Sequence, residues 1–292
     1  MSLASAPSLA RTLSEWTFDP VIVCALVASA LLYVLAVRRA RRRWPGTRSV
    51  SFLAGLAVVS VALLSGVDGY ADSLLSIHMA QHMLLVIVAP VLLAWGAPVR
   101  LALAASPRRG RRRIAAVLHA APVRAALHPL VGSVVVCALL LGTYFTGLFA
   151  LTLRNATVHE LEHAALLLCG LVLFVPLVAA DPLPRPPTAL ARLCSLTLVM
   201  TAMVVVGAVL SFQGSVRYAH YAATARAMHI SALGDQQLGG VVMWFGGGLL
   251  GAVLTVALVG EALFVEERRQ RRRDLYAAVP TASGRGGGAG LR

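Results

Sequence analysis

Seven long blocks of apolar residues divide this chain of 292 residues and constrain its fold more than any other feature. Each block is close to the roughly 20 residues that a helix needs to cross a hydrocarbon core about 30 Å thick. A helix satisfies its backbone hydrogen bonds within the segment, which an open strand in lipid cannot do. The sequence therefore predicts an all-α polytopic membrane protein, a seven-helix transmembrane bundle. The predicted blocks cover residues 21–37, 50–67, 74–95, 130–149, 159–180, 190–212 and 238–264.

The composition argues against a soluble globular domain. Hydrophobic residues make up 58% of the chain and charged residues only 13%. A soluble protein of this length must cover its surface with polar groups and cannot hide so many apolar side chains. The apolar blocks also lack the alternation of polar and apolar residues that marks the strands of a membrane barrel.

The distribution of basic residues predicts the orientation of the bundle. All 26 basic residues are arginines, and 22 of them fall in alternate connections between the blocks or in the C-terminal tail. Because positive charge is retained on the cytoplasmic side, the N-terminus is predicted outside and the C-terminus in the cytoplasm. The four arginines on the predicted outer side are Arg11, Arg154, Arg217 and Arg226.

The same charge pattern predicts the domain organisation. Residues 1–19 are expected to be an exposed leader, residues 20–265 the seven-span membrane domain, and residues 266–292 a basic, disordered cytoplasmic tail. The arginine runs are expected to anchor helix ends at anionic lipid head groups, so membrane lipids are predicted partners and nucleic acid is not.

Two pairs of histidines stand at the predicted outer ends of apolar blocks. His78 and His82 begin the third block, and His159 and His163 begin the fifth. Residues four apart lie on one face of a helix, one turn above the other, so each pair can close on one ion. Ionisable groups inside membrane segments are costly and tend to mark ligands or pathways. The four histidines are therefore predicted metal ligands.

Two methionines add a second kind of donor to the third block. Met79 and Met83 are also four apart, and they lie roughly 100° around the helix from the histidines. Imidazole together with thioether sulfur suits copper better than magnesium or calcium. The sequence therefore predicts transiently bound copper, with both methionines among its ligands.

The seventh block contributes a carboxylate at the same predicted depth. The third, fifth and seventh blocks all enter the membrane from outside, so their first turns can meet within the bundle. Asp235 is predicted as a further metal ligand on this basis. The neighbouring polar side chains expected at the site are Gln81, Glu162 and Gln236.

Other interpretations of these histidines stay open. Residues 159–163, HELEH, match the H-E-x-x-H pattern of zinc metalloproteases, in which Glu160 would be the general base and Asp235 could supply the third ligand. Haem binding uses the same imidazoles, and a purely structural role would use them as hydrogen-bond partners.

Three segments of the chain carry motifs that are similar to one known family. The first segment, within 78–99, reads HMAQHMLL, then AP and LLAWGAPV. The second, within 159–184, reads HELEH, then G, PL and DPLP. The third, within 221–244, reads Y followed by SALGDQQLGGVVMW. With them the chain, over about residues 70–250, resembles CtaG, the membrane-embedded cytochrome c oxidase assembly factor associated with caa-type oxidases.

The resemblance implies a seven-span fold and a role in maturing a copper-containing oxidase in a bacterial plasma membrane. It implies an assembly factor and not an enzyme, one that helps copper reach the catalytic subunit. The implied partners are cytochrome c oxidase subunits and a separate copper-handling protein, because no copper-resistance domain is seen in this sequence. The best match to the motif is at His78 and His82, followed by His163, His159, Asp235 and Gln236.

Overall fold

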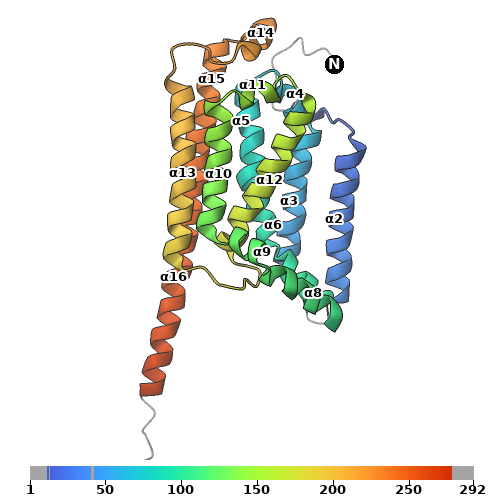
Figure 1. Ribbon diagram of the computed structural model, residues 1–292, viewed down its shortest axis with the longest axis vertical. Coiled ribbons are helices and arrows are strands. Elements are labelled where there is room, and N and C mark those ends of the chain that lie inside the picture. The colour runs from blue at the N-terminus through green and yellow to red at the C-terminus, as the bar shows by residue number, and fades with distance from the viewer. Residues whose placement is uncertain (1–11, 13, 41–42, 278–292) are drawn as a thin grey trace, which may run out of the picture.

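The computed structural model describes residue 12 and residues 14–40 and 43–277, and every regular element in them is a helix. The long helices run side by side in a bundle, with short helices at both of its ends (Figure 1). Of the predicted leader, residues 1–11 and 13 lie outside the described residues, and Thr17 N–H donates to the Leu64 carbonyl at 2.7 Å. The first elements are α2 (Pro20–Arg39), α3 (Gly46–Leu64), α4 (Gly66–Ala71), α5 (Leu75–Met83), the π-helical turn η1 (Leu84–Val88), α6 (Ala89–Trp95), α7 (Pro98–Ala105), α8 (Arg108–His119) and α9 (Ala121–Ala126).

The second half of the chain completes the bundle. Its last helix runs on to Ala277, so residues 266–277 of the predicted disordered tail are helical, supported by an i,i+4 ion pair between Glu267 and Arg271 at 2.6 Å. The remaining elements are α10 (Pro129–Phe145), α11 (Leu148–Thr152), α12 (Ala156–Val178), α13 (Ala189–Phe212), α14 (Ala219–Ala227), α15 (Ala232–Val241), the π-helical turn η2 (Val242–Gly246) and α16 (Gly247–Ala277).

Six helical segments in the described part of the chain are long and apolar enough to cross a membrane. The predicted block 130–149 forms a shorter helix, because the chain leaves the helix at Thr146 and begins α11 at Leu148. At 17 residues, α10 is about 26 Å long. The prediction of a polytopic helical membrane protein is thus confirmed, with six segments of full crossing length and one shorter apolar helix. The six segments are Pro20–Arg39, Gly46–Leu64, Leu75–Ala105, Ala156–Val178, Ala189–Phe212 and Ala232–Arg271.

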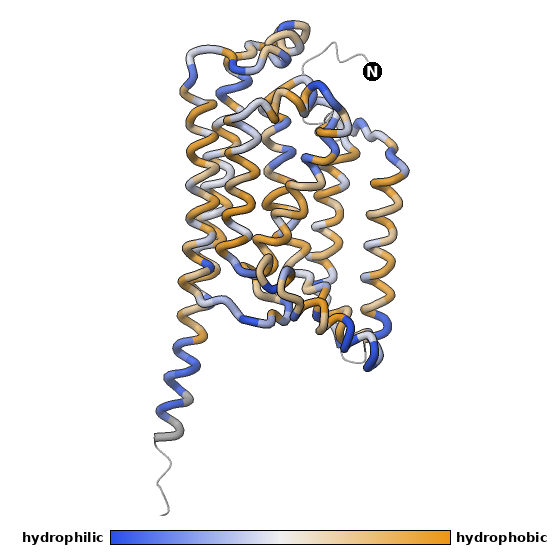
Figure 2. The backbone as a smooth tube through the Cα atoms, in the orientation of Figure 1, coloured by the Kyte–Doolittle hydropathy of each residue, from blue (hydrophilic) through white to orange (hydrophobic). Residues whose placement is uncertain are grey.

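Polar residues gather at the two ends of the bundle and apolar residues fill its length (Figure 2). The buried core joins side chains of α5, η1, α10, α12 and α13, including Leu85, Leu140 and Leu173. Many large apolar side chains elsewhere face outward, and α2 buries Tyr33 alone among its described residues. Such an apolar exterior is what a bundle surrounded by lipid presents.

A close contact sets the position of α12 against the helix that carries the first histidine pair. Pro90 has no N–H group, so it cannot pair with the carbonyl of Val86 one turn earlier, and the chain forms the π-helical turn η1 there. Gly170 of α12 packs on this place: a Cβ on Gly170 would lie 2.5 Å from the Val86 oxygen and 2.6 Å from Pro90 Cγ. The glycine therefore lets the two backbones meet.

We predict that Gly170→Ala destabilises the protein by about 1–3 kcal/mol, because the added methyl group overpacks this contact. Thermal unfolding of the detergent-solubilised protein measures the effect. Gly142→Ala on α10 is the matched control, since a Cβ there meets nothing within 4 Å. Equal unfolding temperatures for the two variants would show that the contact at Gly170 does not hold the helices together.

Candidate metal centre

The two predicted histidine pairs face each other between α5 and α12. The ring centroids are 4.2 Å apart within each pair. Between the pairs, His78 lies 5.3 Å from His159 and His82 lies 6.2 Å from His163. The prediction that these imidazoles share one depth in the bundle therefore matches the structure. The helix ends at Leu75 of α5 and Ala156 of α12, near which these histidines stand in the sequence, lie at the end of the bundle that carries α4, α11 and α14 (Figure 1).

Three of the buried groups converge as a set of ligands. One nitrogen each from His78 and His82 and one oxygen from Glu162 lie within 4.8 Å of one another. The distance from His82 Nε2 to Glu162 Oε2 is 4.0 Å. All three side chains are buried, and His78 Nε2, His82 Nε2 and both Glu162 oxygens lack a hydrogen bond of normal geometry, although the Thr152 hydroxyl lies near Glu162. Buried polar atoms normally have partners, so two imidazoles and a carboxylate aimed at one point fit a cation.

Tyrosines from other helices fix the two imidazoles. The Tyr221 hydroxyl of α14 lies 3.1 Å from the Ala71 carbonyl and 3.0 Å from His78 Nδ1. If its single proton is donated to Ala71, the hydroxyl accepts from His78 Nδ1–H, which assigns the lone pair of the neutral ring to Nε2. Burial raises the pKa of Tyr221 well above its ordinary value, so this hydroxyl keeps its proton. Tyr144 of α10 lies 2.7 Å from His82 Nδ1 and so fixes the orientation of the second ring.

The structure places the predicted methionine ligands in the apolar core. Met79 and Met83 are both buried and belong to the main cluster of core side chains. Met83 also lies beside Gly247 of α16, whereas the second histidine pair is on α12. Their position about 100° around α5 from the histidines turns them toward this packing. Thioether ligation stays a prediction from the sequence.

The carboxylate of Asp235, which the sequence predicts as a metal ligand, accepts hydrogen bonds at the first turn of α5. Its carboxylate accepts hydrogen bonds from the backbone N–H of Leu75 at 2.6 Å and of Ser76 at 3.4 Å, and from the Ser76 hydroxyl. These groups are at the first turn of α5, where N–H groups have no partner within the helix. Asp235 thus ties α15 to the start of the histidine-bearing helix, and its role as a metal ligand stays a prediction from the sequence.

The two predicted glutamines also hold backbone in place. Gln81 Nε2 donates to the Ala62 carbonyl at 2.9 Å and to Asp68 Oδ1 at 2.8 Å, which joins α5 to α3 and α4. Gln236 Oε1 accepts from Arg217 N–H at 2.7 Å, and its Nε2 lies 3.2 Å from the Ser215 carbonyl. Both residues therefore frame the site from its sides.

Acidic side chains surround the outer edge of the histidine cluster. His159 Nδ1 lies 3.9 Å from Asp72 Oδ1, and the Asp72 side chain is 68% exposed. Glu160, which follows His159 on α12, is exposed. Burial, together with the charges of Asp72 and Glu160, raises the pKa of Asp68 to about 6, although its hydrogen bond from Gln81 acts the other way. The edge of the cluster that meets solvent is thus rich in carboxylate.

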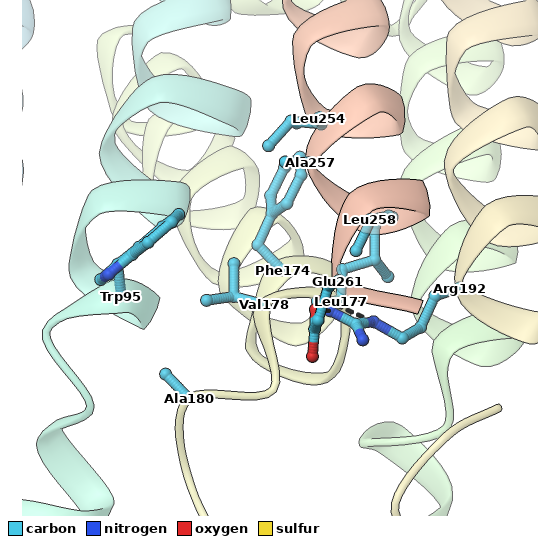
Figure 3. Close-up of a pocket in the computed structure, with 10 residues that line it drawn as sticks. All are labelled: Trp95, Phe174, Leu177, Val178, Ala180, Arg192, Leu254, Ala257, Leu258 and Glu261. Atoms are coloured by element: carbon cyan, nitrogen blue, oxygen red, sulfur yellow. Dashed lines mark hydrogen bonds and ion pairs between the residues drawn. The ribbon is translucent and has the colours of Figure 1, made fainter. Parts of the chain in front are cut away.

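A cavity of about 330 Å³, separate from the histidine cluster, is lined by residues that include Trp95, Arg192 and Glu261 (Figure 3). Its wall is apolar apart from an ion pair of 2.8 Å between Arg192 and Glu261. Arg192 Nε also donates to the Leu177 carbonyl at 2.6 Å. This cavity holds an ion pair that is already satisfied, in contrast to the unpartnered ligand atoms of the histidine cluster.

Sequence reasoning missed part of the site. Tyr144 carried no signal within an apolar block, and Tyr221 was visible as part of the third family motif but not as a partner of His78. Asp72 stands six residues before His78, but nothing in the sequence places it beside His159. All three reach the histidines through the packing of helices that are distant in sequence.

Tyr221→Phe removes the hydroxyl that holds His78 and is expected to weaken metal binding about tenfold, the lower end of the loss seen for such supporting groups. Titration of the purified protein with Zn²⁺ or Cu²⁺ measures this. Tyr218→Phe is the matched control, because its hydroxyl bonds the Tyr144 carbonyl at 3.3 Å and no histidine. An affinity in Tyr221→Phe equal to that of the control would contradict the role assigned to this hydroxyl.

Comparison with known proteins adds an independent finding. A family model described as cytochrome c oxidase caa3 assembly factor (Caa3_CtaG) matches residues 31–263. The chain is 32% identical over 286 residues to an uncharacterized protein of Mycobacterium bovis and to one of Mycobacterium tuberculosis, and 29% identical to one of Mycobacterium leprae. These alignments cover 94% of this chain and 43% of each relative, so the chain spans less than half the length of the curated relatives it matches. No solved structure matches the chain.

Proposed function

Because this chain belongs to the cytochrome c oxidase caa3 assembly factor family, as its motifs predicted, we propose that it binds copper and supplies it to the catalytic subunit of the oxidase. The proposed ligands are His78, His82 and Glu162. In this role copper is cargo that arrives and leaves. The partners are cytochrome c oxidase subunits and a copper-handling protein, and the chain acts as an assembly factor without a catalytic reaction of its own.

The observation that carries the proposal is the set of unpartnered ligand atoms in the buried site. Two imidazole nitrogens and a carboxylate suit a divalent first-row metal, and at such sites copper binds more tightly than zinc. Three protein ligands leave a coordination position open, as sites that exchange a ligand require. The ligands need no rearrangement of hydrogen bonds before binding, because their outward atoms have no partner to lose.

The proposal also includes the arrangement in a bacterial plasma membrane. Seven crossings, with α10 as the fourth, would put the histidine cluster near the outer face and the C-terminus in the cytoplasm. The arginine-rich helix α8 and the arginines at the end of α16 lie at the opposite end of the bundle from the cluster (Figure 1), which agrees with retention of positive charge inside.

The first test is direct copper binding by purified protein. We expect His78→Ala/His82→Ala to bind one Cu²⁺ ion fewer per chain than the unchanged protein, because two of the three ligands of the site are lost. His229→Asn is the control: it removes an exposed imidazole at a residue with φ of 58°, a conformation that asparagine tolerates. Copper stoichiometry that does not change in the double variant would eliminate this site. A haem spectrum in the purified protein would instead favour the haem interpretation.

The second test is oxidase maturation in cells. Without this chain we expect several-fold lower oxidase activity and oxidase copper content, with partial recovery when copper is added to the medium. The double histidine variant should fail to restore activity. Glu160→Gln should restore it, because the proposed copper site does not use this residue, whereas a metalloprotease would need it as its base. Normal oxidase copper in cells without the chain would contradict copper delivery, and failure of Glu160→Gln alone would favour proteolysis.

A further inference from the structure

We propose that His159 and His163 form a second metal subsite, through which an ion passes from the outer face to the His78–His82–Glu162 site. Asp72 is the residue at which the ion enters. This inference rests on the proposed copper function, because it assigns the route by which the copper reaches the buried ligands.

The two histidines of α12 have free ligand atoms of their own. Both ring nitrogens of His163 and Nε2 of His159 are buried without a hydrogen-bond partner. His163 is only 2% exposed, so water does not replace the missing partners. Two imidazoles whose centroids are 4.2 Å apart on one face of a helix are arranged to share an ion.

This pair is distinct from the first group of ligands. In the described part of the chain, the group whose ligand atoms all lie within 4.8 Å of one another contains His78, His82 and Glu162 but neither histidine of α12. The ring of His159 nevertheless stacks on that of His78 at 5.3 Å, with planes 17° apart. The subsites are therefore separate but adjacent, a separation that an ion can cross by exchanging one ligand at a time.

Exposure decreases step by step along this path. The side chain of Asp72 is 68% exposed and that of His159 is 12% exposed. His163 and His78 are almost completely buried, at 2% and 0%. A hydrated cation can therefore reach Asp72 first, and each later ligand lies deeper in the protein.

The surroundings of the entrance favour a cation that comes from water. Asp68 lies near Asp72, so two carboxylates raise the local concentration of positive ions. The other approach to His163 is a groove of about 470 Å³ between α2, α3 and α12. Its lining is apolar apart from Ser29, Glu160 and His163, so it offers a hydrated ion few polar groups.

The stoichiometry of Cu²⁺ binding to the purified full chain tests the second subsite. We expect two ions per chain in the unchanged protein, one in His159→Gln/His163→Gln and one in His78→Ala/His82→Ala. Two ions retained in His159→Gln/His163→Gln would overturn the second subsite and leave the proposed function standing. A single ion that either double variant abolishes would show one shared four-histidine site and would also overturn the inference. An unchanged stoichiometry in His78→Ala/His82→Ala would instead remove the proposed copper site.

The rate of loading tests the entry route separately. Asp72→Asn is expected to retain both ions but to load them about tenfold more slowly at low ionic strength, with a smaller difference in high salt. Glu266→Gln is the control, since it removes the same charge from an exposed residue on α16. Because Asp72 is largely exposed, its substitution leaves the packed core unchanged. Equal loading rates for the two variants would overturn entry at Asp72.

Discussion

The close packing of α12 on the helix that contains η1 is the interaction on which the rest of the site depends. Four imidazoles and a carboxylate from two different helices can converge only if those helices keep a fixed rotation and register. The missing N–H of Pro90 and the missing Cβ of Gly170 let the backbones approach at one place, two turns from Glu162 and His163. Asp235 holds the start of α5, and the contact at η1 holds its end, so the histidines of α5 are fixed from both sides.

This rigidity explains how so much polar surface is kept inside an apolar bundle. Buried imidazoles and carboxylates are costly in an apolar environment unless they have partners. The structure provides partners for one side of each α5 histidine, through Tyr221 and Tyr144, and turns the other side toward Glu162. The cost of the remaining unpartnered atoms is offset when a cation binds, so the fold and the proposed cargo stabilise each other.

The sequence predicted those features of the site that depend on local periodicity. A spacing of four residues was enough to put His78 with His82, and His159 with His163, on one face of a helix, and the alternation of crossings brought both pairs to one depth. Rotation about the helix axis depends on packing, so the ligand roles of Asp235 and Glu162 were not separable from the sequence. The predicted ligand Asp235 caps α5, whereas Glu162, predicted as an accessory residue, lies with His78 and His82 in the group proposed to bind the ion. The length of α10 likewise depends on the turn at Thr146, which an apolar block does not reveal.

The donor set also bears on how an ion would leave. A closed site of four ligands holds its metal tightly, whereas three ligands leave a position at which an incoming group can begin the exchange. The second histidine pair lies within reach of the first, so a departing ion can gain an imidazole before it loses one. Each intermediate would then keep several ligands, so the ion would not be released bare into an apolar environment, where its loss of solvation would set a high barrier. Two adjacent pairs of histidines on facing helices would thus meet the opposing requirements of the proposed carrier, which must hold an ion securely and still give it up.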